Sequence, residues 1–461
     1  MRRRAVVLGT ALSRTMVILA AGLLLGSSAP APASVSSSGV PAVLVSQVTA
    51  TCSGQNAEVQ TAIDPAAQVL YEAWIGCSRK VGRSGEVPFI GFARSTDGGK
   101  TFSRGTGLPG SAFGWDPAIA LGPTGKVYVA FMVSTGVRTY PVIDISANHG
   151  RTFPMARSLI PPRQGNWGDR DFIAVGPHGE IYLTWDYGPV NDIFFNPPVQ
   201  GGSASFAAGD VNAVVQRSTD DGKTWSKIIP ISPGFPTSGA DSAPVLVEPD
   251  GRIDVLYQGY QVLNRKTLKF GVAHSYFTTS TDHGLKWSKP IRIGPARLSM
   301  NTTGWWIDGS LGIDTAGNLY TTWDTQSGGH DIGWLAYSTT KGRAWSRLIR
   351  VTPDTDNALH LVQVTGGARR TAYVGWLTNA PARGYAPYLR VFSISKGWLT
   401  PVIRVAATLG NRYVWPGDTI GLSLFPGGTG RGHAIAVSWG SAHGSRKAPS
   451  EIWALVVTHL P

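Results

Sequence analysis

The chain has 461 residues, more than one average hydrophobic core, although repeat folds can reach this size as a single domain. Charged residues make up only 15 % of it and the formal net charge is +13, which predicts a weakly charged, moderately basic surface. No run of five or six like charges occurs, so we expect no nucleic-acid partner. The positive balance fits attraction to anionic glycans or wall polymers, the alternative being a solvated surface without a specific partner.

The N-terminal segment has the features of a secretory signal. Met1–Arg4 and Arg14 form a basic leader, followed by an apolar run from Met16 to Leu25 and by small residues ending Ala31-Pro32-Ala33. The apolar run is shorter than the ~20 residues that span a bilayer. We therefore predict a signal peptide over 1–33 and a secreted domain over 34–461 with no membrane attachment, the alternative being an uncleaved anchor.

A short box of the form Ser-x-Asp-x-Gly-x-Thr-Trp recurs along the chain, with its serines 51 to 72 residues apart. The good copies begin at Ser95, Ser146, Ser218 and Ser280. A copy at Ser338 lacks the Asp, and a worn copy begins at Ser393. The third residue can accept hydrogen bonds from backbone N–H groups of its own turn, and the following Gly can take positive φ. We therefore predict a structural role for the residues at the third position, Asp97, Asn148, Asp220 and Asp282.

A second repeat precedes the boxes and consists of two β-rich runs around a Pro/Gly turn, which predicts a tight hairpin. Seven copies occur, over 59–74, 116–131, 170–185, 242–257, 308–323, 359–376 and 419–439. Hairpin, strand, box and strand give four antiparallel strands per unit, and such units close radially into a β-propeller. Five hairpins end on Trp at equivalent positions, which favours packing between blades: Trp74, Trp185, Trp323, Trp376 and Trp439.

The last unit is incomplete, because the seventh hairpin is followed by a single strand over 451–461. The missing strand is expected to come from 42–50, which would close the ring by mixing the two ends of the chain. We predict an all-β fold, a single β-propeller of seven four-stranded blades. A six-bladed ring with one hairpin wrongly assigned is the alternative.

The chain contains two cysteines, Cys52 and Cys77. Cys52 falls in the loop that enters the first blade, and Cys77 in the loop between the second and third strands of that blade. These loops lie on the same face of a propeller. In an exported chain we therefore predict a disulfide between them.

The repeated box resembles the Asp-box, or bacterial neuraminidase repeat, of the sialidase superfamily, and its spacing extends the resemblance over most of the chain after the leader. The resemblance implies a propeller with the boxes between third and fourth strands. The family's catalytic set of an arginine triad, a Tyr–Glu pair and an Asp is poorly matched. Where the family has an Arg-Ile-Pro motif, this sequence has Asn56-Ala57-Glu58. The resemblance therefore concerns the fold more than the catalysis.

Acidic residues recur at the blade entrances, on the face opposite the boxes, where function usually lies among long loops. Glu58, Asp116 and Asp308 occupy the same slot, six residues before the hairpin turn. Arg170 fills that slot in the third blade, flanked by Asp169 and Asp171. Further candidates near the slot are Asp241, Asp418, Tyr413, Trp115, Trp167, Trp306 and Trp415.

Carboxylates among tryptophans at a channel mouth suit a sugar site, because acids bond hydroxyls and transfer protons while indoles stack on sugar rings. The candidate catalytic residues are Glu58, Asp116, Asp171 and Asp308. The candidate substrate-binding residues are Arg170, Trp115, Trp167, Trp306, Asp241, Tyr413, Trp415 and Asp418. In the alternative interpretation the acids cap loop N–H groups, pair with Arg170 or Arg412, or hold a structural Ca²⁺. No cofactor is required.

Three functions follow from this pattern. The first is a secreted, monomeric, exo-acting glycoside hydrolase whose partner is a glycan or cell-wall polysaccharide. The second is a propeller that binds glycan or wall without catalysis, and the third is a sialidase with a rearranged site. Retaining and inverting hydrolases separate their carboxylates by about 5–5.5 Å and about 6.5–9.5 Å, which the sequence leaves open.

Overall fold

The computed structural model describes residues 43–44, 56–80, 86–135, 138–154, 156–161, 166–189, 193–195, 206–209, 211–234, 238–264, 269–294, 309–327, 330–353, 362–380, 384–406, 417, 419–425, 433–442 and 450–461. The signal peptide predicted over 1–33 and Cys52 lie outside these residues, as does the side chain of Cys77. Their roles stay predictions. In the described part of the chain no helix is long and apolar enough to cross a membrane.

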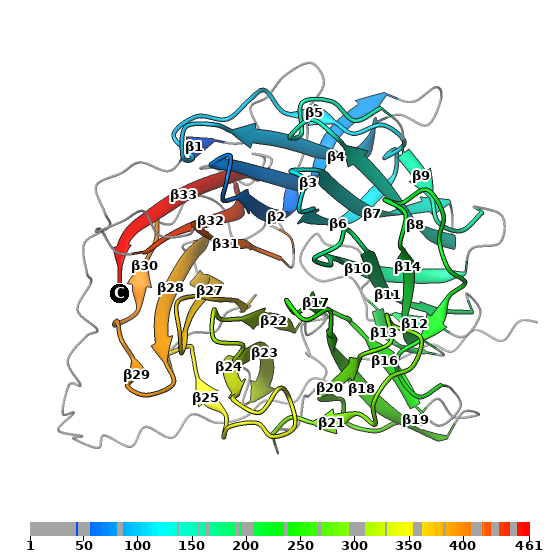
Figure 1. The fold of residues 1–461 in the computed structure, drawn as a ribbon, viewed down its shortest axis with the longest axis vertical. Helices are drawn as coiled ribbons and strands as arrows, with labels where there is room; N and C mark the ends of the chain where they lie inside the picture. Colours follow the sequence, from blue (N-terminus) through cyan, green and yellow to red (C-terminus); the bar gives the residue numbers. More distant parts are fainter. Residues whose placement is uncertain are drawn as a thin grey trace, which may run out of the picture. The chain divides into compact units, whose positions relative to one another are not determined.

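The described elements are antiparallel strands arranged as blades of a propeller (Figure 1). Blade 1 contains β2 (Ala57–Asp64), β3 (Val69–Lys80), β4 (Glu86–Ser95) and β5 (Thr106–Gly107). Blade 2 contains β6 (Gly114–Leu121), β7 (Val127–Thr135), β8 (Arg138–Ser146) and β9 (Ala156–Ser158). Blade 3 contains β10 (Trp167–Val175), β11 (Ile181–Gly188), β14 (Asn212–Ser218) and β15 (Ile229–Pro230), and a ribbon of β12 (Ile193–Phe195) and β13 (Phe206–Gly209) lies between its second and third strands in the chain.

Blade 4 has an inner strand in two pieces, β16 (Ser238–Asp241) and β17 (Val245–Val247), followed by β18 (Ile253–Asn264), β20 (His274–Ser280) and β21 (Ile291–Arg292), with β19 (Lys269–Phe270) paired to β18. Blade 5 contains β22 (Ser310–Ile313), β23 (Leu319–Ser327), β24 (His330–Ser338) and β25 (Ile349–Arg350). Blade 6 contains β26 (Gln363–Gly366), β27 (Thr371–Ala380), β28 (Gly384–Ser393), β29 (Gly397–Trp398) and β30 (Ile403–Arg404).

Blade 7 combines the two ends of the described chain. It contains β31 (Gly421–Phe425), β32 (His433–Ala442) and β33 (Ser450–Leu460), and its outer strand is β1 (Val43–Leu44). Val43 pairs with Ala454 and Leu44 with Trp453. The predicted closure and the seven blades are therefore confirmed, and the six-bladed alternative is wrong.

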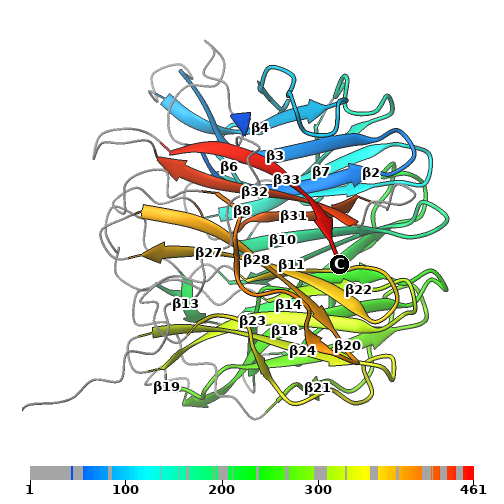
Figure 2. The same ribbon diagram turned by 90° about the vertical axis from the view of Figure 1, so that its left-hand side faces the viewer.

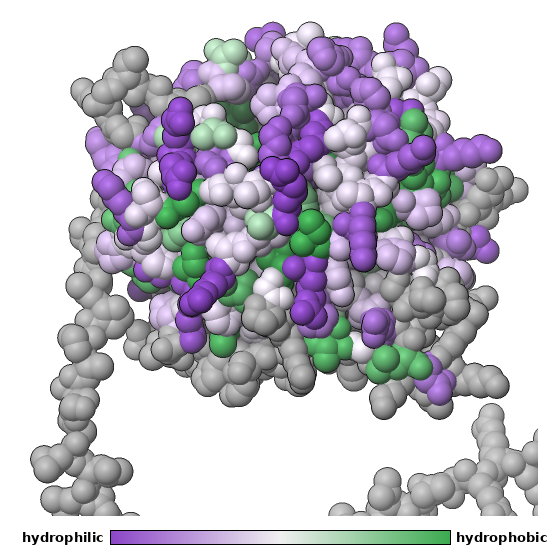
Figure 3. Space-filling view, turned by 60° about the horizontal axis from the view of Figure 1, so that its bottom comes forward, coloured by the Kyte–Doolittle hydropathy of each residue, from purple (hydrophilic) through white to green (hydrophobic). Residues whose placement is uncertain are grey.

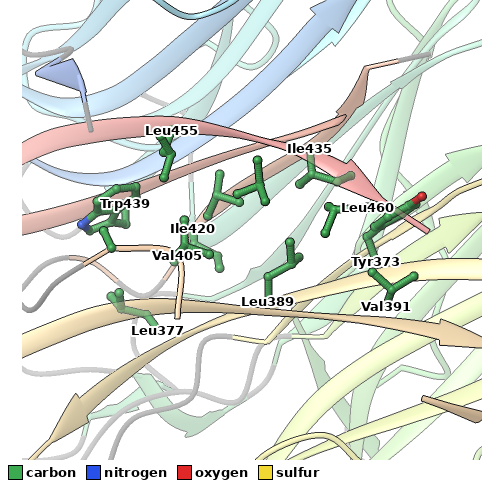
Figure 4. Packing of buried hydrophobic residues seen from close by; sticks show 13 residues of the cluster. Tyr373, Leu377, Leu389, Val391, Val405, Ile420, Ile435, Trp439, Leu455 and Leu460 are labelled. Atoms are coloured by element: carbon green, nitrogen blue, oxygen red, sulfur yellow. The ribbon is translucent and has the colours of Figure 1, made fainter. Parts of the chain in front are cut away.

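The hydrophobic core is divided among the interfaces between neighbouring blades. The five tryptophans that end second strands are at most 1 % exposed. Figure 4 shows one such interface, where Leu377 and Leu389 of blade 6 face Trp439 and Leu455 of blade 7. Burying each aliphatic side chain of this size contributes about 1.5–3 kcal/mol, so every blade depends on its neighbours. On the surface seen in Figure 3, hydrophobic residues form small separate patches among polar ones.

Each good box is a hydrogen-bonded turn. In the third blade Ser218 Oγ accepts a bond from the Gly222 backbone N–H at 2.8 Å. Asp220 accepts bonds from the Thr224 hydroxyl at 2.6 Å and the Thr224 N–H at 2.8 Å, and these bonds lower its pKa to about 2. The acid of the box therefore stabilises its own turn.

The boxes also connect neighbouring blades. The residue after the third box position has positive φ in four boxes: His149, Asp221, His283 and Lys341. Three of these side chains reach the hairpin turn of the preceding blade, as His149 Nδ1–Asp64 Oδ2 at 3.3 Å, Asp221 Oδ2–Lys126 Nζ at 2.7 Å and Lys341 Nζ–Asp250 Oδ2 at 2.8 Å. Boxes and hairpin turns therefore share one face, and Figure 2 shows the short turns gathered on one side of the ring.

Replacing Asp220 by alanine is expected to lower the melting temperature by roughly 1–2 °C, because the turn loses the acceptor of several hydrogen bonds. Asp220→Asn is the matched control, since Asn148 already accepts the equivalent bond from the Thr152 N–H at 2.9 Å. Thermal unfolding followed by circular dichroism measures both. An alanine variant as stable as the asparagine variant would contradict the structural role.

Candidate active site at the blade entrances

The inner strands of four successive blades begin with the same irregularity. Glu58, Asp116, Arg170 and Ser242 have φ values of 51°, 49°, 57° and 51°. In the first three blades the residue lies where the pairing register shifts, and in the fourth it lies between β16 and β17. A non-glycine residue in this conformation costs roughly 1–3 kcal/mol, and such strain concentrates at functional sites. The slot read from the sequence is therefore a shared bulge.

The bulges bring together acids from the first three blades. The carboxyl groups of Asp169 and Glu58 lie within hydrogen-bonding reach of the Asp116 carboxyl and lower its pKa. The backbone N–H of Arg170 lies 3.2 Å from both Asp116 Oδ2 and Asp169 Oδ1. Since two carboxyl groups can bond each other only when one carries a proton, Asp116 and Asp169 form a proton-sharing pair.

The surroundings of the two acids shift their pKa values in opposite directions. Burial opposes ionisation of Asp116, but hydrogen bonds from Asp169 and Glu58 and the charge of Arg170 outweigh it and lower its pKa. Burial, reinforced by the charge of Asp116, raises the pKa of Asp169 well above its ordinary value. Environments that separate two pKa values in this way define an acid and a base. Asp169 is then the proton donor and Asp116 the acceptor.

A second acid pair lies beside the first. Asp186, at the end of β11, is fully buried and accepts a bond from the Asp169 N–H at 3.1 Å. Its carboxyl also bonds that of Asp241, which accepts the Ser242 N–H at 2.8 Å. Burial, then the charge and hydrogen bond of Asp241, raise the pKa of Asp186 well above its ordinary value. This pair therefore keeps a proton to a higher pH than an ordinary aspartic acid does.

Asp171 is the most isolated acid of the group. It is 4 % exposed, and neither carboxyl oxygen has a hydrogen-bond partner among the described residues. Burial and the charge of Asp116 raise its pKa well above the ordinary value. A neutral Asp171 that can donate a proton is the chemical consequence.

The charge of the Arg170 guanidinium favours ionisation of Asp116, Asp169 and Asp186. Together with Glu58, Asp171 and Asp241 these acids form the acid cluster, which has six carboxyl groups in the described part of the site. In a low-dielectric setting they cannot all ionise, so several share or retain protons. Within the described residues no three His, Cys, Asp or Glu side chains are arranged to hold a metal ion. Carboxyl groups whose pKa values are shifted in opposite directions can give and take protons.

The aromatic residues near the cluster differ in exposure. Trp115 is 37 % exposed beside Asp116, whereas Trp167 is 8 % exposed and packs in the core with Val211 and Leu256. A buried indole offers little surface to a ligand, so Trp115 is the better placed of the two. Five predicted residues lie outside the described residues and stay predictions: Trp306, Asp308, Tyr413, Trp415 and Asp418.

Blade 7 also reaches the cluster. Gly417 has a φ of 96°, and a Cβ added to it would lie 2.2 Å from the backbone nitrogen of Glu58. Only glycine fits this approach, which brings the entrance of the last blade against the entrance of the first.

Asp186 and Phe113 were not predicted as site residues from the sequence. Asp186 follows Trp185, and because neighbouring strand residues point to opposite faces, an acid after an inter-blade Trp was a usable signal. Phe113 lies in an irregular loop and is 39 % exposed, with no periodic pattern to mark it.

A cavity of about 740 Å³ opens on the opposite face, lined by the hairpin turns of blades 1 to 4 at 63–67, 121–125, 175–177 and 247–249. The two acids that line this cavity already have hydrogen-bond or ion-pair partners. Asp64 accepts bonds from the Ala66 and Ala67 N–H groups at 3.0 and 2.9 Å, and Glu248 pairs with Arg252. The acid cluster at the entrances is therefore the stronger candidate for chemistry.

Comparisons with known proteins agree with this architecture. The family model described as BNR/Asp-box repeat matches residues 216–227, which include the third box of this seven-bladed propeller. The sequence has no significant match among curated proteins.

Propeller enzymes that act on carbohydrates are among the similar solved structures. An ulvan lyase of polysaccharide lyase family PL25 has a TM-score of 0.54 and 11 % identity over 89 % of this chain and 96 % of its own. A GH93 α-L-arabinofuranosidase of Fusarium graminearum, solved with arabinobiose, has a TM-score of 0.51 and 13 % identity over 77 % and 98 %. The Hadza microbial sialidase Hz136 has a TM-score of 0.47 and 11 % identity over 91 % and 95 %. At these identities the likeness concerns the fold.

Proposed function

We propose that this protein is a secreted, monomeric glycoside hydrolase whose acid cluster cleaves a glycosidic bond. The feature that carries the proposal is the Asp116–Asp169 pair, in which the pKa of one carboxyl is lowered and that of its neighbour is raised. Glycosidic cleavage needs a proton delivered to the leaving oxygen and a carboxylate near the sugar. The structural neighbours, hydrolases and lyases of glycans, support a carbohydrate ligand.

In this mechanism Asp169 is the general acid. Its proton moves to the glycosidic oxygen as the bond to the anomeric carbon breaks, and water adds to that carbon. Since Asp116 bonds Asp169 directly, the two lie closer than the acid and nucleophile of either hydrolase geometry. Asp116 therefore positions the acid and favours its protonated form, while another carboxyl of the cluster faces the anomeric carbon and takes the proton that the attacking water loses. That proton then returns to Asp169 and restores the acid.

Charge indicates the kind of sugar. In the described part of the site the charge of Arg170 is already matched by the ionised Asp116, so a sugar carboxylate or sulfate would find no further cation there. Neutral glycosides are the substrates that this balance favours. A sialoside or uronide would need cations beyond Arg170.

The second candidate is a propeller that binds glycan without cleaving it. It is favoured by the absence of the Arg-Ile-Pro motif at residues 56–58 and by the exposed Trp115. Exposed indoles bind sugar rings whether or not chemistry follows.

A panel of neutral and anionic chromogenic glycosides, together with a glycan array, separates these functions. Turnover of neutral glycosides supports the hydrolase, and sugars released with a reducing end distinguish hydrolysis from elimination, which leaves an unsaturated product. Array binding without any turnover would establish the binding propeller instead. A protein that neither cleaves nor binds any of these glycans would refute both functions.

A further inference from the structure

The loop that enters blade 2 presents two aromatic side chains to solvent. Phe113 is 39 % exposed and Trp115 is 37 % exposed, and they are the large aromatic side chains with the greatest exposure in the described part of the chain. Most other described aromatic residues are packed between blades. Exposed aromatic area of this kind gains free energy when a ligand covers it.

The backbone that carries Phe113 is held from both sides. Its N–H donates to the Pro88 carbonyl of blade 1 at 2.9 Å, and its carbonyl accepts the Ser134 N–H of blade 2 at 3.1 Å. The loop before it is pinned by Ser111, whose hydroxyl donates to the Leu108 carbonyl at 2.7 Å and accepts the Ile90 N–H at 3.1 Å. The aromatic ring is therefore presented on a rigid support, which reduces the entropy lost on binding.

Phe113 also has a φ of 61°, a conformation that bulky residues rarely adopt. Glycine would remove this strain, yet the position carries an exposed phenyl ring. Strain retained for an exposed side chain is an indication of function, because nothing in the packing of the core requires that ring.

Position links the two rings to the acid cluster. Both rings lie at the entrance of blade 2, because Trp115 directly precedes Asp116 near the start of β6 and Phe113 lies two residues earlier. Gly114 between them packs against blade 1, where an added Cβ would lie 2.9 Å from Ile90. The rings are therefore presented at the same blade entrance as the carboxyl of Asp116.

We propose that Phe113 and Trp115 form a stacking platform for a sugar unit adjacent to the one that is cleaved, so the ligand is an oligosaccharide or polysaccharide rather than a single sugar. This inference rests on the proposed function for its catalytic readout. Aromatic rings bind the C–H faces of sugar rings, and the neighbouring carboxyls bond the hydroxyl groups at the ring edge. The platform selects for chain length and leaves the proton transfer to the acids.

The test compares substrates of increasing length in four proteins: wild type, Phe113→Gly, Trp115→Ala and the control Leu285→Ala, whose exposed leucine lies in the box of blade 4 on the other face. For substrates long enough to cover the platform, KM should rise about 2- to 10-fold in each platform variant. For a chromogenic monosaccharide, KM should rise less in each platform variant than it does for the long substrates. The control should match wild type throughout.

Phe113→Gly also separates binding from folding. Since glycine accepts positive φ without strain, this variant should melt at or above the wild-type temperature while binding long substrates more weakly. A KM that is unchanged with length in both platform variants would overturn the proposal.

If wild type turns over no glycoside, the proposed function fails and the platform is tested by binding alone. Titration of oligosaccharides should then change tryptophan fluorescence in wild type and the control but much less in Trp115→Ala and Phe113→Gly. Equal binding by all four proteins, or binding by none, would overturn the platform as well.

Discussion

Replacing Asp169 by asparagine is expected to lower kcat on neutral glycosides by about 10²- to 10⁴-fold, the range typical of a lost general acid. The amide keeps the size of the side chain and can still bond Asp116, but it has no proton to transfer to a leaving oxygen. Asp116→Asn should cause a comparable loss, because the charge that keeps Asp169 protonated disappears. Steady-state kinetics on the best substrate of the panel measures both effects.

The pH profile supplies an independent check on Asp169. Because its pKa is raised in the folded protein, the acid form persists to a higher pH than in an ordinary aspartic acid, and activity should fall as the pH rises through that pKa. The lowered pKa of Asp116 places the opposite limb at acid pH, where its carboxylate is lost. In Asp169→Asn the alkaline limb should disappear.

Asp282→Asn is the control for these variants, since Asp282 serves a box turn on the opposite face. It should retain wild-type kcat and the wild-type pH profile. A fully active Asp169→Asn enzyme, or one with an unchanged alkaline limb, would remove Asp169 from the mechanism.

The second large effect concerns the closure of the ring. Glu72 of blade 1 is fully buried, and its carboxyl bonds Thr61 and Ser438, each at 2.6 Å. Thr61 Oγ1 lies 3.0 Å from Ser438 Oγ, so the three groups form a closed circuit that joins blade 1 to blade 7. A protonated Glu72 completes this circuit with one proton for each bond. Burial raises the pKa of Glu72 to about 8 despite these two bonds.

A raised folded-state pKa makes stability depend on pH with a definite sign. The unfolded chain ionises Glu72 near its ordinary pKa of about 4.3, whereas the folded chain keeps it protonated up to about 8. The contribution of Glu72 is therefore complete below about pH 4.3 and is lost progressively as the pH rises toward 8. The expected slope is about 1.4 kcal/mol per pH unit in that window.

Glu72→Gln should remove this dependence, because the amide can donate to Thr61 and accept from Ser438 at every pH. The variant should be more stable than wild type near pH 8, while the difference between the two narrows toward pH 5. Urea unfolding at a series of pH values measures the free energy of unfolding of each. Glu180→Gln, in the hairpin turn of blade 3, is the control and should follow wild type; parallel curves for all three proteins would contradict the protonated circuit.

Much of the fold could be predicted because its signals are local. The Ser, Asp and Gly of a box form hydrogen bonds with one another within a few residues, so the turn does not depend on distant parts of the chain. The spacing of the boxes along the sequence therefore gives the length of one blade. The incomplete last unit then required a strand from the other end, which β1 supplies. The inward face of Trp185 and its equivalents follows from the alternation of strand residues.

The site could be predicted only in part. The entrance slot was visible as a recurring acid in Glu58 and Asp116, and the shared bulge explains why it recurs. Asp186 belongs to the cluster although it lies on the second strand of its blade. Trp167 is buried and Trp115 is exposed, although each lies close to a blade entrance. Exposure of each indole depends on the loops and neighbouring blade that cover it, which no local pattern records.

The sequence by itself determined the number of blades, their closure and the face on which the acids gather, because hydrogen-bonded turns and strand alternation depend on neighbours along the chain. The tertiary structure decided which carboxyls bond each other and which of them keeps its proton. Asp116 and Asp169 differ in protonation although both are aspartates at blade entrances. That difference comes from burial and from charges a few ångströms away on other blades, and both exist only once the ring has closed.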